Sequence, residues 1–204
     1  MRRSILACGL LLAFVGMTTA AAAAGKSGGA GDTTNGTTTT SATTAVTTKS
    51  DSARRTEARA AAYWSRHIRR FHAGTRRWLS VVHGRPVGSA RVPAAHSVQR
   101  LRLLARAWRH RERAAWWRAT HPPHLQTWNC IHHYEGSWSD SGGPYWGGLQ
   151  MDLGFQATYG GWLLRHKGTA DHWSPLEQIW VAVRAAHARG FSPWPNTARY
   201  CGVY

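Results

Sequence analysis

Glu135 is the side chain whose surroundings in the sequence suggest acid–base chemistry. It lies in the segment CIHHYEGSW (130–138), and the segment YWGGLQ (145–150) follows closely. Apolar surroundings disfavour the charged form of a carboxyl group, which can then stay protonated near neutral pH. Cleavage of a glycosidic bond requires such a general acid. On local pattern alone, a glutamate near aromatic residues is more often a helix-surface or capping residue than a catalyst.

The residues that follow the glutamate could bind a sugar. Trp138, Tyr145 and Trp146 carry rings that can stack on sugar faces, although core packing is the common alternative for such rings. Gly147 and Gly148 permit close backbone approach beside Gln150. This composition suggests a glycan-binding cleft next to the acid.

The adjacent histidines His132 and His133 do not suit a metal site, because neighbouring residues of a helix point about 100° apart. We expect neither a metal nor a cofactor.

The beginning of the chain has the layout of an export signal. Arg2 and Arg3 precede an apolar run from Ile5 to Val15, and small residues continue to Ala24. We therefore expect residues 1–24 to be a cleaved signal peptide and the mature protein to be secreted or associated with the cell wall. No later stretch approaches the roughly 20 apolar residues of a transmembrane helix.

Residues 25–52 consist mainly of Thr, Ser, Gly and Ala, which cannot bury enough apolar surface to fold. They predict a disordered linker. Residues 53–124 are rich in Arg, Ala and Trp, and apolar residues at helical spacing predict two amphipathic helices there. Glycines and prolines between Gly84 and Pro93 interrupt them.

The basic segment 53–124 dominates the charge of the protein. The chain has 26 Lys and Arg against 9 Asp and Glu, whereas the basic and acidic residues cancel from Thr127 onward. Such a segment could bind an anionic cell-wall polymer or a membrane surface. It could equally be a solvated pair of helices. Nucleic acid is not expected as a partner, because no nucleic-acid-binding motif is present.

Removal of the signal would leave two cysteines, Cys130 and Cys201. Outside the cell an even pair is expected to be oxidised. A bridge closing this loop would stabilise the fold by about 4 kcal/mol in the chain-entropy model. Two free thiols are the alternative, and a zinc site lacks the paired ligand spacing that such sites have.

Residues 125–204 predict a small, mainly helical domain without strands. Helices are expected over 127–138, 152–159 and 175–189, the second ending at Gly160–Gly161. The third has clear boundary signals, with Ser174 as N-cap, Pro175 at the first helical position and Glu177 three residues after the cap.

Taken in order, these motifs resemble the resuscitation-promoting factor domain, a trimmed lysozyme-like fold of secreted cell-wall hydrolases. The segments 147–161 and 177–195 match the family pattern, and Trp128 stands seven residues before Glu135, as in the family. The resemblance covers roughly residues 125–201. It implies that Glu135 is the catalytic acid/base and that Gln150 and Gln178 lie near the glycan cleft.

The sequence departs from the family at three places. The family's first cysteine immediately precedes the glutamate, whereas Cys130 lies four residues, about one helical turn, further upstream. Cys201 is displaced as well, which suits a retained disulfide. The gap between Glu135 and Trp138 is short, and Phe155 stands where the family tends to carry a cleft threonine.

The number of carboxylates at the site decides which cleavage mechanisms are possible. Lysozyme-type hydrolysis uses two, about 5 Å apart for retention and wider for inversion. Asp140 and Asp152 are the nearest candidates, but turns and helix caps also favour aspartate at these positions. If neither takes part, Glu135 can act alone and release a 1,6-anhydro sugar, as lytic transglycosylases do.

We therefore expect a secreted, monomeric enzyme that cleaves the β-1,4 glycan of peptidoglycan, as a muramidase or a lytic transglycosylase. One alternative is a non-catalytic protein that binds wall glycans or signals through the same cleft. Another is a protein whose active part is the basic segment, bound to a membrane or a polyanion.

Overall fold

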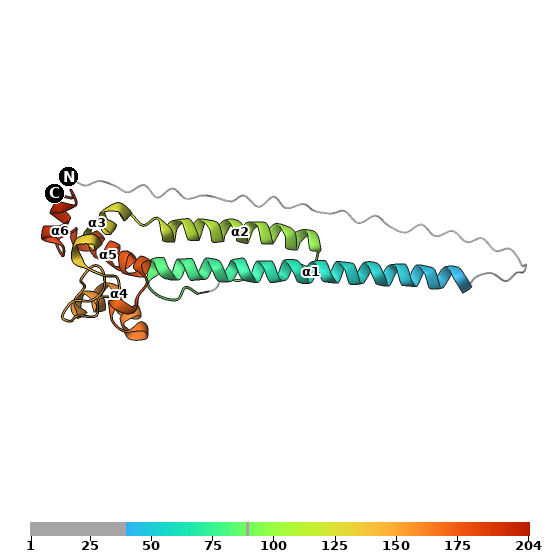
Figure 1. The fold of residues 1–204 in the computed structure, drawn as a ribbon. Helices are drawn as coiled ribbons and strands as arrows, with labels where there is room; N and C mark the ends of the chain where they lie inside the picture. The colour runs from blue at the N-terminus through green and yellow to red at the C-terminus, as the bar shows by residue number, and fades with distance from the viewer. Residues whose placement is uncertain (1–39, 89) are drawn as a thin grey trace, which may run out of the picture.

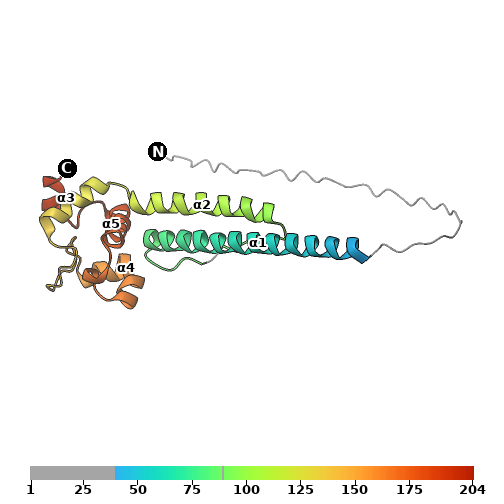
Figure 2. The same ribbon diagram turned by 45° about the vertical axis from the view of Figure 1, so that its right-hand side comes forward.

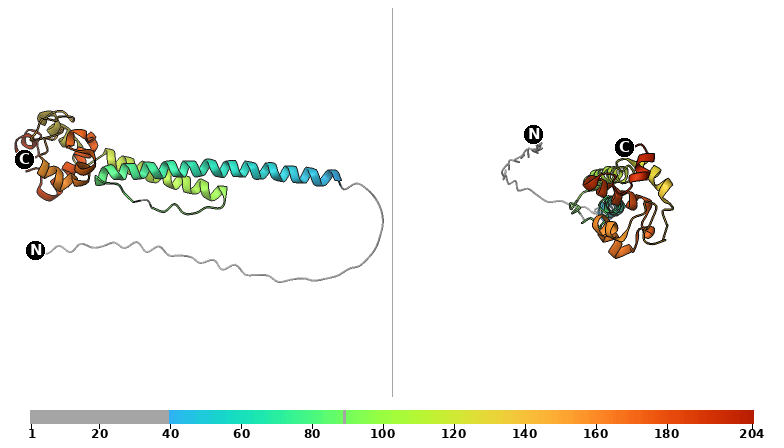
Figure 3. Two further views of the ribbon diagram at one scale, coloured as in Figure 1. Left: turned by 90° about the horizontal axis from the view of Figure 1, so that it is seen from below. Right: turned by 90° about the vertical axis from the view of Figure 1, so that its left-hand side faces the viewer.

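The computed structural model describes residues 40–88 and 90–204. Within these ranges the protein is mainly helical, as the sequence predicts, and contains no β-strand. Two long helices form an arm that ends at a compact group of shorter helices (Figures 1 and 3). The expected signal peptide and most of the expected linker lie outside the described residues.

The arm consists of α1 (Thr40–His83) and α2 (Val98–Thr120). Both helices run toward the C-terminal domain, because the segment 84–97 returns along α1 before α2 begins (Figures 1 and 2). Along this return segment, Arg76 Nε donates to the Val87 carbonyl at 3.2 Å. The segment cannot continue a helix, since it contains Pro86 and Pro93.

The apolar stripes predicted for the basic segment pack the two arm helices together. The buried residues of this interface are Ile68, Leu101, Ala105 and Trp108. Ser97 caps α2 by accepting a hydrogen bond from the Arg100 amide at 3.3 Å. Helix α1 begins at Thr40, earlier than the predicted end of the linker at residue 52. No glycine or proline lies between these positions, so nothing in the backbone stops the helix there.

The C-terminal domain contains five helical elements: α3 (Leu125–Glu135), α4 (Leu153–Lys167), η1 (Ala170–His172), α5 (Pro175–Arg189) and α6 (Pro195–Tyr200). Helix α5 lies at its centre and buries eight side chains between Glu177 and Ala185. Its predicted start is confirmed, since Ser174 and Glu177 form a reciprocal capping box.

Two helix boundaries differ from the prediction. Helix α3 ends at Glu135 rather than at Trp138, because Gly136 leaves the helix with a φ of 144°. Helix α4 reaches Lys167 across a kink at Gly160, whose φ of −131° and ψ of 21° are not helical. The predicted break at this glycine is therefore confirmed, but the helix resumes after it. Gly160 packs against Trp173 and Val181. A Cβ on Gly160 would lie 2.8 Å from the Trp173 ring.

The arm and the C-terminal domain share one hydrophobic core. Val82 and Ala119, at the ends of α1 and α2, belong to the same buried cluster as Trp180 of α5. Arg184 of α5 donates to the Val82 carbonyl at 2.9 Å and to the Tyr159 carbonyl at 2.8 Å. Burial lowers the pKa of Arg184 to about 10, so its guanidinium stays charged at neutral pH. Residues 53–124 and 125–204, which were predicted to be separate units, therefore share one core in the structure.

None of the helices in the described ranges is both long and apolar enough to cross a membrane.

Candidate active site

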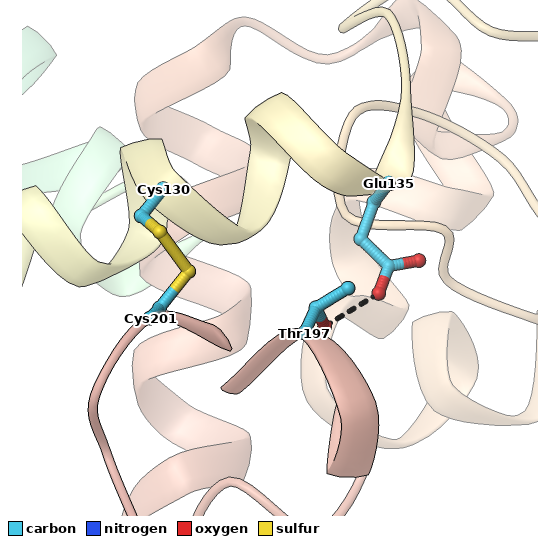
Figure 4. Close-up of a disulfide and its surroundings, with 4 residues drawn as sticks. All are labelled: Cys130, Glu135, Thr197 and Cys201. Atoms are coloured by element: carbon cyan, nitrogen blue, oxygen red, sulfur yellow. Dashed lines mark hydrogen bonds between the residues drawn. A yellow bond between two sulfur atoms is a disulfide. The ribbon is translucent and has the colours of Figure 1, made fainter. Parts of the chain in front are cut away.

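Glu135 lies at the last position of α3, where the chain turns into the loop 136–152. Its carboxyl group is partly exposed. The hydroxyl of Thr197, in α6, donates a hydrogen bond to Glu135 Oε1 at 2.7 Å (Figure 4). Sequence reasoning expected aromatic neighbours for this carboxyl and did not identify Thr197, which lies 62 residues away along the chain.

A disulfide between Cys130 and Cys201 connects α3 to the end of α6, which confirms the predicted pair. Its Cα atoms are 5.9 Å apart, an ordinary separation for a disulfide. The bridge and the Glu135–Thr197 hydrogen bond join the same two helices at neighbouring turns (Figure 4). The orientation of α6 relative to the glutamate is therefore fixed at two points.

The loop after Glu135 is held by its own polar groups. Asp140 accepts hydrogen bonds from Gln150 Nε2 at 2.8 Å and from the Gly142 amide at 3.0 Å. Trp146 and Met151 pair through two backbone hydrogen bonds of 3.1 and 3.0 Å. Asp140 is thus engaged by the loop at both carboxyl oxygens.

A groove of about 430 Å³ lies beside this loop. Its lining combines polar and aromatic side chains: Tyr145, Gln150, Asp152, Phe155, Thr158, Tyr159, Arg189 and Trp194. Gln150 also lies beside Gly136, since a Cβ on this glycine would be 3.3 Å from Gln150 Nε2. The groove and the end of α3 are therefore neighbours. Of the sequence-predicted binding residues, the groove contains Tyr145 and Gln150.

Trp138 and Trp146 do not line this groove. Trp138 stacks on His132, with ring centres 3.9 Å apart and planes inclined by 20°. Trp146 is half-buried and packs against the core of the domain. Both rings help to hold the loop that carries the groove residues.

Gln178 was predicted to lie near the cleft, but the structure places it in the core, fully buried. Its side-chain oxygen accepts from the Gly148 amide at 2.9 Å. Its amide donates to the carbonyls of Trp138 and Ala170, both at 2.8 Å, and of Trp173 at 3.1 Å. Gln178 supplies hydrogen-bond partners to buried backbone groups, which would otherwise be unpaired. In this way it connects α5 to the loop before α4 within the core. A bound glycan would not reach it.

The second carboxylate candidate, Asp152, caps α4. Its Oδ1 accepts from the Phe155 amide at 2.7 Å, and the side chain is exposed at the groove. Phe155 itself is buried beneath the groove, with its ring centre 5.5 Å from that of Trp194. Its ring contributes apolar surface to the groove lining.

The histidines beside the glutamate have separate roles. His132 Nδ1 is hydrogen-bonded to the Gly148 carbonyl at 3.2 Å, and His133 is exposed. Among residues 40–88 and 90–204, no group of three or more His, Cys, Asp and Glu side chains could hold a metal ion.

In comparisons with known proteins, no protein-family model matches the chain, and no curated protein is significantly similar to it.

Proposed function

We propose that this protein cleaves the β-1,4 glycan of peptidoglycan, with Glu135 as general acid and base. The observation that carries the proposal is the position of Glu135. Its carboxyl accepts a hydrogen bond from Thr197 at the end of α3. Glu135 does not itself line the groove, but the next residue, Gly136, lies beside Gln150, which does, and aromatic rings contribute to the groove lining. The motif resemblance to resuscitation-promoting factor domains supports the same assignment.

The environment of the two aspartates favours the mechanism with a single carboxylate. Both oxygens of Asp140 accept hydrogen bonds within the loop, and Asp152 caps α4. In this mechanism Glu135 donates its proton to the glycosidic oxygen as the bond from that oxygen to C1 breaks. The resulting carboxylate takes the proton of the substrate's own C6 hydroxyl, whose oxygen bonds to C1. The product is a 1,6-anhydro sugar and Glu135 is again protonated.

The groove would bind the sugar chain next to the reacting bond. Tyr145 is 48% exposed and can stack on a sugar face, and Gln150 supplies polar groups beside it. Such contacts orient the glycosidic oxygen toward the acid. We further propose that the protein acts outside the cell, where the Cys130–Cys201 bridge would persist.

The test is mass spectrometry of muropeptides released from purified peptidoglycan by the wild-type chain and by Glu135→Gln. The wild type should release 1,6-anhydro products, and the variant should be at least about a hundredfold slower, because it lacks the acid. Reducing-end products without the anhydro ring would indicate hydrolysis instead.

A non-catalytic glycan-binding protein is the alternative function, and the same experiment separates it. In that case neither chain would release muropeptides, although both would bind the glycan.

A further inference from the structure

The arm presents an unusual surface, because its basic residues far outnumber its acidic ones. Seventeen arginines lie between residues 53 and 124, against two acidic residues, Glu57 and Glu112. All seventeen are exposed. They are Arg54, Arg55, Arg59, Arg66, Arg69, Arg70, Arg76, Arg77, Arg85, Arg91, Arg100, Arg102, Arg106, Arg109, Arg111, Arg113 and Arg118.

The charge extends along a rigid element. Helix α1 has 44 residues and is therefore about 66 Å long. Three arginines, Arg77, Arg102 and Arg111, lie over tryptophan rings of the arm at 4.7 to 5.8 Å. The self-repulsion of so many like charges is relieved when counter-charges bind.

A membrane fits this surface poorly. The apolar stripes of the two helices are already used for packing between them, at Ile68, Leu101 and Trp108. Tyr63 on α1 and Leu103, Trp116 and Trp117 on α2 are exposed. On α2, Leu103 lies about 20 Å along the helix from the two tryptophans. A helix bound to a bilayer needs a continuous apolar face, and the arm does not offer one.

We propose that the arm binds an anionic polymer of the cell envelope that carries a phosphodiester in each repeating unit. The choice of an envelope polymer over a nucleic acid rests on the proposed function, whereas the requirement for a linear polyanion rests on the charge alone. Binding would hold the groove of the attached domain close to its substrate, because the arm and domain share a core.

The experiment measures binding of the full mature chain to poly(glycerol phosphate) at 0.1 M and 1 M salt. Binding should be strong at low salt and lost at high salt, where the Debye length falls from about 10 Å to about 3 Å. Replacing Arg66, Arg70, Arg106 and Arg113 by Gln should weaken it about tenfold or more. The matched control, with Lys at the same four positions, should bind like the wild type.

Three results would overturn the proposal: unchanged binding by the Gln variant, tighter binding to vesicles rich in phosphatidylglycerol, or tighter binding to duplex DNA. None of these measurements depends on glycan cleavage. A negative result would therefore refute the polymer-binding proposal without refuting the proposed enzymatic function.

A second inference concerns Thr197 and rests on the proposed role of Glu135. The Cys130–Cys201 disulfide joins α3 to the end of α6 about one turn before the glutamate, and the hydroxyl of Thr197 lies beside the glutamate itself (Figure 4).

This hydrogen bond distinguishes the two carboxyl oxygens of Glu135. Thr197 donates to Oε1 of the carboxylate, so Oε2 is the oxygen that this hydroxyl does not engage. Oε2 points away from Thr197 in Figure 4. We infer that Thr197 is a positioning residue, which orients the carboxyl so that Oε2 delivers the proton.

The test compares Thr197→Val, which has the same shape but no donor, with Thr197→Ser, which keeps the donor. The Val variant should lose about tenfold or more in kcat with little change in KM, because orientation matters in the transition state. The Ser variant should recover most of the loss. Equal unfolding temperatures of the three chains would show that the fold is unchanged.

If Thr197→Val retained full kcat while Glu135→Gln was inactive, the positioning role would be wrong and the proposed function would stand. The role would also be wrong if Ser failed to rescue the loss. If Glu135→Gln were itself fully active, the proposed function would fail first.

Discussion

The indole N–H of Trp180 in α5 donates to the backbone carbonyl of Ala119 at the end of α2, 61 residues earlier, at 2.9 Å. Both residues are buried. With the Arg184–Val82 hydrogen bond, this contact ties the C-terminal ends of both arm helices to the central helix of the domain. The arm is therefore a structural part of the domain.

The first prediction concerns a chain shortened to begin at Gln126. It lacks Val82 and Ala119 and leaves the Trp180 indole N–H and Arg184 Nη1 without their acceptors, although Arg184 Nε keeps the Tyr159 carbonyl. We expect it to show no cooperative thermal unfolding and a weak near-UV circular dichroism signal. A matched chain that begins at Asp51 keeps the contacts between arm and domain, and it should unfold like the full chain. Native-like unfolding of the Gln126 chain would show that the domain folds alone.

The second prediction concerns Gln178, whose four hydrogen bonds are buried. Gln178→Met keeps the volume but leaves the Gly148 amide without its acceptor. We expect the free energy of unfolding to fall by at least about 2 kcal/mol, the cost of unpaired buried polar groups. Gln150→Ala should cost less, because Gln150 is partly exposed and water can replace its bonds. Urea titration of both variants measures the difference, and a larger loss for Gln150→Ala would contradict it.

The third prediction uses the neighbouring glycines of α4. A methyl group on Gly160 would lie 2.8 Å from Trp173 and 3.1 Å from Val181, both buried. Gly160→Ala should therefore destabilise by about 1 to 2 kcal/mol through overpacking. Because the backbone of Gly160 is not helical, little gain in helix propensity offsets this cost.

On Gly161 the nearest neighbour of such a methyl is the flexible Arg165 side chain, at 3.4 Å. Gly161→Ala should stabilise by up to about 1 kcal/mol. Denaturant unfolding of the two variants should give shifts of opposite sign, and shifts of the same sign would refute the packing argument.

The fourth prediction is a pH effect at Glu177. Burial alone would raise its pKa, but hydrogen bonds from Lys167 and Ser174 outweigh burial and leave the pKa below the ordinary 4.5. A carboxyl whose folded pKa is lowered adds stability above the ordinary pKa and loses it as the pH falls through the folded value.

Glu177→Gln keeps a capping acceptor without the charge, so it should lower stability at pH 7 by less than about 1 kcal/mol, given the solvent exposure of Lys167. The difference from the wild type should vanish in acid, below the folded pKa. Thermal unfolding of both chains between pH 7 and pH 2 checks this, and a constant difference across that range would contradict it.

Local signals in the sequence were enough to predict several helix boundaries and the helix faces that pack together. The capping box at Ser174 and Glu177, the prolines between the arm helices and the apolar stripes through Ile68 and Trp108 depend on neighbours a few residues away. Such interactions are readable from spacing alone. The even cysteine count after the expected cleavage was likewise enough to predict the Cys130–Cys201 pair.

Only the tertiary structure decided how these elements meet. The Thr197 hydroxyl reaches Glu135 across 62 residues, and Trp180 reaches Ala119 across 61. Gln178 matched a family motif, yet its burial depends on the backbone groups that three other segments bring to it. Gly160 signalled a break in the helix, but the Trp173 ring packed against it and the helix that resumes after it were visible only in the structure. Spacing in the sequence carries no record of such contacts, because they form only when distant segments pack together.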